Sequence, residues 1–536
     1  MKDLLLLGDE ALALGAVHAG VSSVYGYPGT PSTEIIEYLL DYAEENGKPF
    51  VTWCSNEKTS LEEALGASFA GKRALVTMKH VGVNVAADPF VNSALLGIKG
   101  GLVLAVADDP GMHSSQNEQD SRFYADFAKI MLLEPRNQQE AYEMVREAFD
   151  ISERFTIPVM VRLSTRLSHS RAAVVPKEAR EENKMEKASN SKEWMLIPAL
   201  ARKQWKNLLA RQDEFRSFTE ESSHNVLTMN SNFEEFGVIT AGLGGNYYEE
   251  NASELADLPS RLHIALYPLP ENKIRSLAAE VKKLVVIEEG YPFIERQLRG
   301  ILPQSIEIAG KMDGTLPPDG ELNPDNVRGA LGLSPLKGLE ADPGVLPNRP
   351  PQLCAGCPHV DTYNALNEVL SGYDQSLVTA DIGCYALGAI PPYNSIETIV
   401  CMGASIGMAK GASEAGLKPT VAVIGDSTFL HSGMTPLVDA VSCGTAMTVL
   451  IVDNETVAMT GGQETILPSS KIKPLIEGIG VDPEHIRVLD AHRRSHDENV
   501  RVMKQEIDYD GLSVIISVRE CIESAKKRKK KEGAAS

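Results

Sequence analysis

Few cysteines, few aromatic residues and no long apolar run are present in this sequence, and each scarcity excludes a class of protein. Seven cysteines in 536 residues are too few for a disulfide-stapled secreted scaffold. No apolar run approaches the roughly 20 residues of a membrane-spanning helix, and the opening MKDLLLLGDE is too short for a signal-peptide core. We therefore expect a cytoplasmic protein with no membrane span.

Basic residues are also scarce relative to acidic ones. The chain has 52 Lys and Arg against 73 Asp and Glu, a net charge of −21. Such a charge repels both nucleic-acid backbones and anionic membrane surfaces, so we expect no nucleic-acid partner. Hydrophobic residues make up 43% and charged residues 23%, as in ordinary globular proteins, and the length predicts roughly three to five domains.

Alternating apolar and helix-prone segments predict an α/β protein with three doubly wound domains. The first covers residues 1–170, where buried runs such as Leu102–Ala107 alternate with helical segments such as Gln138–Glu153. The remaining regions are a charged helical connector at 171–232, a second α/β domain at 233–310 with strands at Gly237–Ala241, Leu262–Tyr267 and Lys283–Glu288, a Pro- and Gly-rich linker at 311–351, a third α/β domain at 352–524 and a solvated basic tail at 525–536.

Two strand ends in the third domain predict a site for Mg²⁺ and a diphosphate. The segment PTVAVIGDS places Gly425 and Asp426 after one buried strand, and TVLIVDNETVAMTGGQ places Asn454 after the next. Ligands bind at the carboxyl ends of such strands, and hard oxygen ligands suit Mg²⁺. The pattern resembles the thiamine diphosphate motif, a Gly-Asp-Gly followed by a downstream Asn, with Ser427 replacing the second glycine.

This resemblance implies specific roles in cofactor binding. Asp426, the side chain of Asn454 and the backbone carbonyl of Thr456 would bind Mg²⁺. Gly425 and Ser427 would lie against the cofactor, and in GASIGMAKG the residues Gly403, Ser405 and Gly407 would flank its diphosphate.

A glutamate in the first domain is the expected partner of the cofactor's pyrimidine ring, because thiamine chemistry needs a carboxylic acid there. Taken alone, Glu57 would be an acid that stabilises a helix N-terminus. However, three segments resemble segments of the 2-oxoacid:ferredoxin oxidoreductases and occur in the same order along the chain: YGYPGTPSTE, WCSNEKTSLEEALGASFAGKRALVTMKHVGVN and GASIGMAKG. That resemblance assigns the pyrimidine to Glu57 and a contact with substrate or cofactor to Thr30.

Four cysteines have a spacing typical of a metal site. Cys354 and Cys357 form CAGCP, Cys384 lies in DIGCYALG and Cys521 in VRECIES. Four thiolates can hold Zn²⁺ or a [4Fe–4S] cluster, and the spacing does not choose between them. The resemblance to the same oxidoreductases implies the cluster. The other cysteines, each in apolar sequence, are expected in the core: Cys54, Cys401 and Cys443.

Nearly the whole chain resembles the α subunits of the indolepyruvate:ferredoxin oxidoreductase family, most specifically in CAGCPHVDTYNAL and TMKHVGVNVAADP. The resemblance implies thiamine diphosphate-binding folds for the first and third domains and a transketolase C-terminal-like fold for the second. It implies oxidative decarboxylation of an arylpyruvate with coenzyme A to an aryl-acetyl-CoA. Electrons would leave through the [4Fe–4S] cluster to ferredoxin, and a β-type subunit would complete an α₂β₂-type hetero-oligomer.

One departure from that family concerns electron exit. Its α subunits usually continue into a ferredoxin-like domain, whereas this sequence continues into AKKRKKKEGAAS. We therefore expect a separate iron–sulfur partner, and hypothesise that the basic tail docks an acidic ferredoxin-like protein.

Several alternatives stay open at this point. A non-oxidative thiamine diphosphate-dependent decarboxylase would share Glu57, Asp426 and Asn454 but would not need four cluster cysteines; a non-catalytic scaffold would need neither set. Three histidines could move protons but more often serve as hydrogen-bonding residues: His80, His113 and His359. Lys79 or Arg122 could pair with a substrate carboxylate, or lie on the surface.

Overall fold

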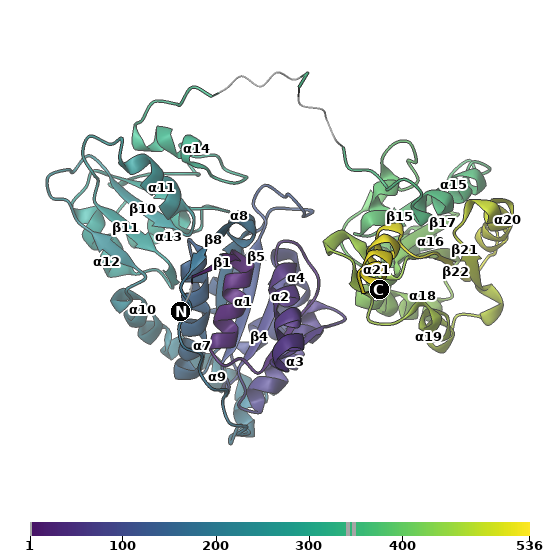
Figure 1. Ribbon diagram of the computed structural model, residues 1–536, viewed down its shortest axis with the longest axis horizontal. Coiled ribbons are helices and arrows are strands. Elements are labelled where there is room, and N and C mark those ends of the chain that lie inside the picture. Colours follow the sequence, from purple (N-terminus) through teal and green to yellow (C-terminus); the bar gives the residue numbers. More distant parts are fainter. Residues whose placement is uncertain (1–2, 339–343, 346–349, 536) are drawn as a thin grey trace. The chain divides into compact units, whose positions relative to one another are not determined.

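The computed structural model describes residues 3–338, 344–345 and 350–535, and contacts divide the chain into two compact units, 1–339 and 340–536 (Figure 1). The ranges of the first two predicted α/β domains both lie in the first unit. Parts of the predicted linker, residues 339–343 and 346–349, lie outside the described residues. Within the described part of the chain, no helix has the length and apolar character needed to cross a membrane.

A seven-stranded sheet organises the first unit. The strand order is β12 (Leu266–Tyr267), β6 (Met131–Leu133), β7 (Val159–Ser164), β5 (Leu102–Asp108), β4 (Ala74–Lys79), β2 (Ser23–Gly26) and β3 (Phe50–Trp53), parallel except for β12. The central strands β7, β5 and β4 are buried along their whole length and mostly apolar, as expected where helices cover both faces of a parallel sheet. The helices of this region are α1 (Gly8–His18), α2 (Thr33–Asn46), α3 (Glu57–Phe69), α4 (His80–Val85), α5 (Ala87–Ser93), α6 (Arg122–Ala128), α7 (Gln138–Phe155) and α8 (Thr165–His169).

A second sheet of the same unit contains five strands. Their order is β14 (Glu307–Ala309), β13 (Lys283–Ile287), β10 (Gly237–Ala241), β11 (Arg261–Ile264) and β9 (Val226–Thr228), with β9 antiparallel to its neighbour. The helices after the connector are α11 (Gly244–Ala252), α12 (Glu271–Ala279) and α13 (Phe293–Ile301).

The predicted strand Leu262–Tyr267 is two strands in two different sheets. β11 belongs to the second sheet, whereas β12 pairs antiparallel with β6 of the first. Asn225 explains the break: its side-chain oxygen accepts hydrogen bonds from the amides of Ala265 and Leu266, at 2.9 and 3.0 Å, and its amide donates to the Leu266 carbonyl at 2.9 Å. A side chain thus satisfies the backbone where the chain changes sheets.

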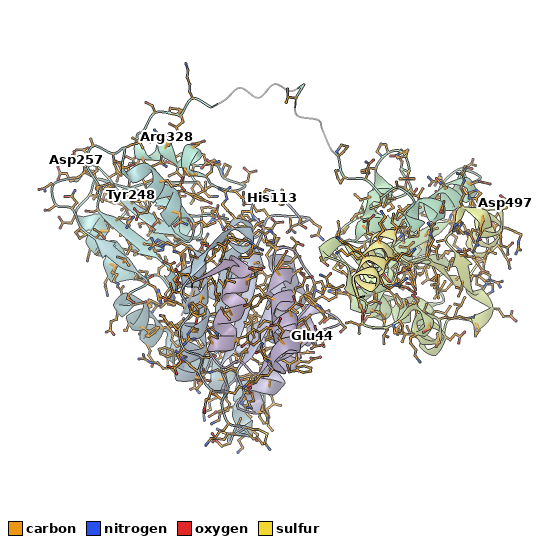
Figure 2. The ribbon with its side chains drawn as sticks, viewed as in Figure 1. Glu44, His113, Tyr248, Asp257, Arg328 and Asp497 are labelled. Atoms are coloured by element: carbon orange, nitrogen blue, oxygen red, sulfur yellow. The ribbon has the colours of Figure 1, made fainter. Side chains whose placement is uncertain are left out.

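The predicted connector contains two strands, β8 (Arg171–Val174) and the second-sheet strand β9, as well as the expected helices. β8 pairs antiparallel with β1 (Leu4–Leu7); the charged composition that follows gave no sign of it. The helices α9 (Pro198–Ala210) and α10 (Gln212–Glu221) agree with the prediction. Beyond the second sheet, α14 (Pro324–Arg328) contacts α11: Arg328 donates to Asn251 at 2.9 Å and pairs with Glu254 at 2.8 Å (Figure 2).

The second unit is a doubly wound parallel sheet. The strand order is β16 (Thr398–Ile399), β15 (Leu377–Ala380), β17 (Thr420–Gly425), β18 (Met447–Asp453), β22 (Leu512–Val518) and β21 (Ile486–Asp490). Side chains alternate between faces along a strand, and Val421 and Val423 join a different core cluster from Ala422 and Ile424. The helices α15 (Pro358–Leu370) and α20 (His496–Ile507) contribute to one cluster, and α16 (Ala404–Glu414), α18 (Met434–Cys443) and α19 (Ile472–Ile479) to the other.

These arrangements confirm the predicted α/β class with mainly parallel sheets. The basic residues predicted as a solvated tail belong to a helix, α21 (Ile522–Ala535). Its first turns are anchored, because the Lys527 ammonium donates to the Gly461 carbonyl at 2.7 Å. The side chains of residues 526–530 are exposed.

Candidate functional site

Asp426 and Asn454 lie at adjacent strand ends of the second unit, as the motif requires. Asp426 follows β17 and Asn454 follows β18, and these strands are paired. The Glu455 amide donates to the Asp426 carboxylate at 2.9 Å, which brings the turn after β18 onto Asp426. Glu455 adopts a left-handed conformation with φ 61°, and the Thr456 amide donates to the Asn454 side-chain oxygen at 3.3 Å.

The carboxylate of Asp426 is in an environment that disfavours its charge. Asp426 and Asp453 are both buried. Burial, and then the nearby Asp453 carboxylate, raise the pKa of Asp426 well above its usual value. Two buried carboxylates and a neighbouring amide oxygen are hard oxygen donors, and a divalent cation would neutralise the carboxylates. These residues therefore fit the predicted Mg²⁺.

The predicted diphosphate residues lie at the start of α16. Gly403 precedes the helix with φ 85°, and a Cβ there would meet Ser432 at 2.3 Å, so only glycine fits. The amide of Ser405 donates to Asp381 at 2.8 Å and its hydroxyl bonds the same carboxylate. Burial raises the pKa of Asp381 to about 6. Gly407 is exposed, with open space where a Cβ would be.

An aromatic ring closes over the Gly-Asp turn. A Cβ on Gly425 would lie 2.6 Å from Tyr385, and one on Gly383 would lie 2.4 Å from it. Tyr385 is buried, and Ser427, next to the turn, is half-buried. The glycine at 425 is therefore required by the protein's own packing as well as by the expected close approach of a cofactor.

The four predicted cluster ligands gather beside this turn. Burial, and then the thiols of Cys357 and Cys521, raise the pKa of Cys384 to about 12, with Asp426 and Cys354 adding to the effect. Burial likewise raises the pKa of Cys357 to about 11, with Cys354 and Cys521 contributing. Cys384 and Cys357 thus each lie within electrostatic reach of the other three thiols.

Backbone contacts hold the cysteine segments together. The Arg519 side chain donates to the Gly356 carbonyl in the CAGC turn at 2.9 Å and pairs with Asp361 at 2.9 Å. The Cys521 amide donates to the Asn454 carbonyl at 3.1 Å. One cluster segment is therefore hydrogen-bonded directly to the segment that carries the predicted Mg²⁺ ligands.

His359 lies between the two predicted sites. Its Nε2 is 3.4 Å from the Cys384 Sγ and 3.4 Å from the Asn454 Nδ2, and the Asn454 amide is 3.8 Å from the same sulfur. Burial lowers the pKa of His359 to about 4, so the imidazole is neutral at pH 7. Sequence reasoning offered no reason to prefer it over His80 or His113.

The other cysteines separate into two kinds. Cys54 is buried as expected, with its Sγ 3.6 Å from a carboxylate oxygen of Glu63. Cys401 and Cys443 are exposed, so the prediction that they fill the core was wrong. Cys401 follows the edge strand β16, and Cys443 ends α18, so the apolar residues around each do not enclose it.

The pyrimidine half of the predicted site lies in the first unit. Glu57 begins α3, is 5% exposed and lies so close to Gly82 that a Cβ on Gly82 would be 2.7 Å from a carboxylate oxygen. The Asn56 side chain caps the helix by accepting from the Thr59 amide at 2.9 Å. The helix N-terminus is thus satisfied by Asn56, and Glu57 is not needed as its cap.

Thr30 and Lys79 lie at neighbouring strand ends of the same unit. Thr30 is half-buried in the loop after β2, and Lys79 ends β4, which pairs with β2. A Cβ on Gly29 would lie 3.1 Å from the Lys79 side chain. Burial lowers the pKa of Lys79 to about 8, although Asp109 and then Glu57 oppose this shift, and its ammonium donates to the Ser114 carbonyl at 2.7 Å.

Arg122 is neither at the surface nor beside Lys79. It is 1% exposed and pairs with Asp120 and Glu288, the latter at 2.9 Å. Arg122 is thus occupied by internal ion pairs.

The other two candidate histidines lie in different environments. His80 is buried, with its Nε2 3.1 Å from the Asn117 carbonyl, whereas His113 is exposed and its Nε2 lies 3.5 Å from Glu321 (Figure 2).

Asp381 and Tyr385 are site residues that sequence reasoning missed, although both flank Cys384 in DIGCYALG. In the sequence, only the cysteine of that segment carries a recognisable signal. Asp381 bonds Ser405 and Tyr385 covers Gly425, and both contacts join residues that are distant in the chain.

Two protein-family models match the chain. Residues 14–224 match the family described as pyruvate flavodoxin/ferredoxin oxidoreductase, thiamine diphosphate-binding. Residues 381–516 match the thiamine pyrophosphate enzyme C-terminal, cofactor-binding domain. Thiamine diphosphate is therefore the cofactor of this fold, in agreement with the sequence motif.

Curated relatives match almost the full chain. Indolepyruvate oxidoreductase subunit IorA of Archaeoglobus fulgidus is 36% identical over 99% of this chain and 88% of its own length. The subunit of the same name from Methanothermobacter thermautotrophicus is 36% identical over 97% of this chain and 87% of its own. A solved chain titled 2-oxoglutarate:ferredoxin oxidoreductase from Magnetococcus marinus, with 2-oxoglutarate, coenzyme A and succinyl-CoA bound, is 15% identical with a TM-score of 0.49 over 57% of this chain and 62% of that one.

Proposed function

Because the chain belongs to the indolepyruvate oxidoreductase subunit IorA family and is a subunit of a thiamine diphosphate-dependent 2-oxoacid oxidoreductase, we propose that it acts on an arylpyruvate. In the proposed reaction the bond between the carboxylate and the 2-oxo carbon breaks and CO₂ leaves. A thioester to coenzyme A forms in its place, and the thiol proton and two electrons are released. The two electrons reduce a ferredoxin-type acceptor.

The convergence of four thiols on the thiamine-type turn carries this proposal. Cys384 is linked through His359 to Asn454, and Cys521 is bonded to the Asn454 backbone. A non-oxidative decarboxylase has no electrons to export and no use for such an arrangement. An electron acceptor held here would adjoin the Mg²⁺ and diphosphate residues of the same unit.

Thiamine diphosphate, when bound, supplies a thiazolium carbon that can hold the electron pair left by decarboxylation. Asp426, Asn454 and the Thr456 carbonyl would hold its Mg²⁺, and the glycines of the α16 turn and of the Gly425 turn would admit its diphosphate. Glu57 would hold a proton for the pyrimidine. Thr30 would contact substrate or cofactor.

Partners follow from the same assignment. We assign to the chain a β-type second subunit, an α₂β₂-type assembly and a ferredoxin or separate iron–sulfur protein as acceptor. The exposed basic side chains of α21 directly follow the ligand Cys521, which suits an acidic acceptor. All seven cysteines are free thiols, which supports a cytoplasmic location.

Metal analysis with substrate-dependent bleaching tests the proposal. Iron, acid-labile sulfide and zinc are measured per chain on the anaerobically purified complex, and the visible spectrum is recorded before and after indolepyruvate and coenzyme A. We expect about four irons per chain and bleaching only when both substrates are present. Absence of iron, or one zinc per chain, would overturn the oxidative assignment, and release of an aldehyde without coenzyme A would identify a decarboxylase.

Two single-cysteine variants, one at a predicted ligand and one at a control position, test the ligand assignment. Cys384→Ser removes a predicted ligand and is expected to lower iron content and abolish bleaching. Cys443→Ser changes an exposed thiol of the same unit and is expected to leave both unchanged. Equal iron in the two variants would contradict the ligand assignment.

A further inference from the structure

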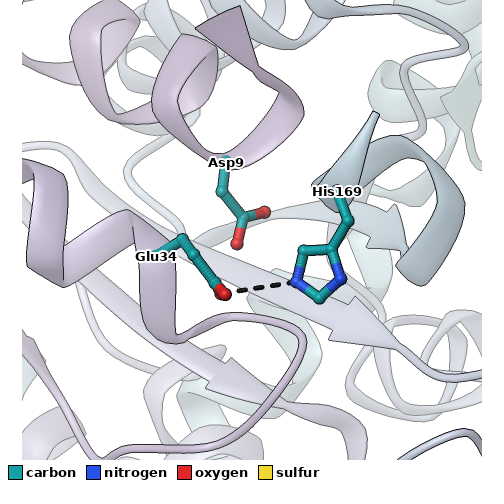
Figure 3. A group of neighbouring side chains, drawn as sticks. All are labelled: Asp9, Glu34 and His169. Atoms are coloured by element: carbon teal, nitrogen blue, oxygen red, sulfur yellow. Dashed lines mark ion pairs between the residues drawn. The ribbon is translucent and has the colours of Figure 1, made fainter. Parts of the chain in front are cut away.

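A buried carboxylate without a partner lies beside an ion pair in the first unit. Asp9 is on the first turn of α1, Glu34 on the first turn of α2, and His169 ends α8. The His169 Nε2 is 3.4 Å from the Glu34 Oε2. One ligand atom from each of the three residues lies within 4.8 Å of the other two, and the Asp9 carboxylate points toward the pair (Figure 3).

Asp9 is not satisfied by the protein. It is 0% exposed, and no described donor lies in good hydrogen-bonding geometry with either carboxylate oxygen. Burial raises the pKa of Asp9 to about 8, and the neighbouring Ser168 hydroxyl only partly offsets this shift. A buried carboxylate without a donor is costly, and a protein avoids the cost by pairing the group, by coordinating a metal with it or by keeping it protonated. His169 is already paired with Glu34, so the ion pair alone does not account for the position of Asp9.

We propose that Asp9, Glu34 and His169 bind a divalent transition-metal ion of the Zn²⁺ class, at a site separate from the thiamine diphosphate and cysteine residues. Two carboxylate oxygens and one imidazole nitrogen are a donor set that suits such ions and not Mg²⁺ or Ca²⁺, which prefer oxygen alone. The 3.4 Å separation of the His169 and Glu34 atoms is close to the separation of two ligands on one tetrahedral ion with bonds of about 2.1 Å.

Partial exposure of two ligands gives the ion a route to the site. Glu34 and His169 side chains are 33% and 35% exposed, so a water molecule can occupy a fourth position, as in open three-ligand zinc sites. Asp9 forms the closed side of the site.

The site would fasten three separate segments of the first unit. Glu34 lies directly after the loop that carries Thr30, and His169 lies directly before β8. A metal held by these residues would fix the start of α2 and therefore the adjoining Thr30 loop.

Zinc content of the full-length chain tests the proposal. The anaerobically purified protein is dialysed against Zn²⁺ in the presence of excess Mg²⁺, and zinc and iron are measured per chain. We expect His169→Ala to bind one zinc fewer than wild type, with unchanged iron. Equal zinc in wild type and His169→Ala would overturn the proposal.

A second histidine of the same unit provides the matched control. His224 pairs with Glu147 at 2.6 Å and belongs to no described three-ligand group. His224→Ala is expected to retain the zinc that His169→Ala loses; loss of the same zinc in both variants would overturn the assignment. If His169→Ala does not fold, Glu34→Gln, which keeps the side-chain shape, decides the question: zinc affinity must fall at least about 10-fold, and an unchanged affinity overturns the site.

Replacement of zinc by Co²⁺ identifies the ligands. The absorption spectrum of Co²⁺-loaded His169→Ala is subtracted from that of Co²⁺-loaded wild type. The difference spectrum should contain d–d bands but no thiolate-to-cobalt charge-transfer band, because none of the proposed ligands is sulfur. A charge-transfer band in that difference would move the ion to the cysteines and overturn the site.

Discussion

Two buried polar clusters, one in each unit, satisfy their polar groups in opposite ways. In the first unit, Arg122 and Arg162 are paired with carboxylates, Arg162 donating to Asp108 at 2.6 Å and also to Glu134. In the second unit, the His359 Nε2 has contacts of 3.4 Å to Cys384 and to Asn454. The first cluster is completed by the protein, whereas the second is arranged around groups that a ligand would complete.

This contrast distinguishes polar groups that stabilise the fold from polar groups that bind a ligand. The Arg122 and Arg162 cluster joins the end of β5 and β7 in the first sheet to Glu288, at the end of β13 in the second sheet. Each arginine of the cluster is paired with buried carboxylates, so removing one arginine should cost stability. In the second unit, burial raises the pKa of Cys384, with the neighbouring thiols adding to the shift, and raises the pKa of Asp426, with Asp453 adding to it. A bound metal relieves this state.

The largest expected effect comes from removing one charge of the paired cluster. Arg162→Ala leaves Asp108 and Glu134 buried without their partner, at a cost of about 3–5 kcal/mol. We expect the apparent melting temperature to fall by on the order of 10 °C, measured by circular dichroism. Arg216→Ala, which breaks an exposed pair with Asp213, should change it little, and an equal change in both variants would refute the contrast.

Asp426→Asn should weaken cofactor binding without lowering stability, the opposite of the effect expected for Arg162→Ala. Removing a carboxylate from beside Asp453 relieves repulsion, so the melting temperature without cofactor should hold or rise. Thiamine diphosphate affinity in Mg²⁺, measured by calorimetry, should fall by about 100-fold. Asp439→Asn, an exposed carboxylate on α18, serves as the control; unchanged affinity in Asp426→Asn would remove Asp426 from the Mg²⁺ site.

His359→Gln tests the group between the two predicted sites. Gln keeps hydrogen-bonding capacity but cannot hold the same contacts to Cys384 and Asn454, so substrate-dependent bleaching should slow by roughly 10-fold with iron content unchanged. Stopped-flow absorbance measures the rate. His496→Gln, at a surface pair with Glu368, should keep the wild-type rate, and so would His359→Gln if the imidazole only fills space.

The smallest effect is expected at α21. The double change Lys529→Glu and Lys530→Glu reverses two exposed charges and should slow ferredoxin reduction several-fold at low salt, with the difference shrinking at high salt. Cluster content should stay the same. A rate that is unchanged at every ionic strength would exclude α21 as the docking surface.

Sequence patterns were reliable where burial alone decides structure. The strands at Leu102–Ala107 and Thr448–Val452 were expected from their apolar runs and lie within β5 and β18. The break between Ile264 and Leu266 could not be read in the same way, because both sides are apolar and the cause is the distant side chain of Asn225.

The site was predictable to the extent that its residues are close in sequence to a motif. Asp426 and Asn454 follow buried strands, and the structure brings them together through the Glu455 amide. Asp381 and His359 contact residues that are distant in the chain, Ser405 and Asn454 respectively. The spacing of residues along the sequence does not predict such contacts. The same holds for Asp9 and His169.

The pairing of β12 with β6 of the first sheet limits where the chain can be cut into separately folding fragments. The matched family model ends at residue 224, before the strand Leu266–Tyr267 that completes the sheet beside β6. A fragment cut at that boundary would leave the β6 edge uncovered, and open sheet edges recruit other chains. The two sheets of the first unit therefore belong in one expressed fragment, because cutting between them removes the strand that protects the β6 edge.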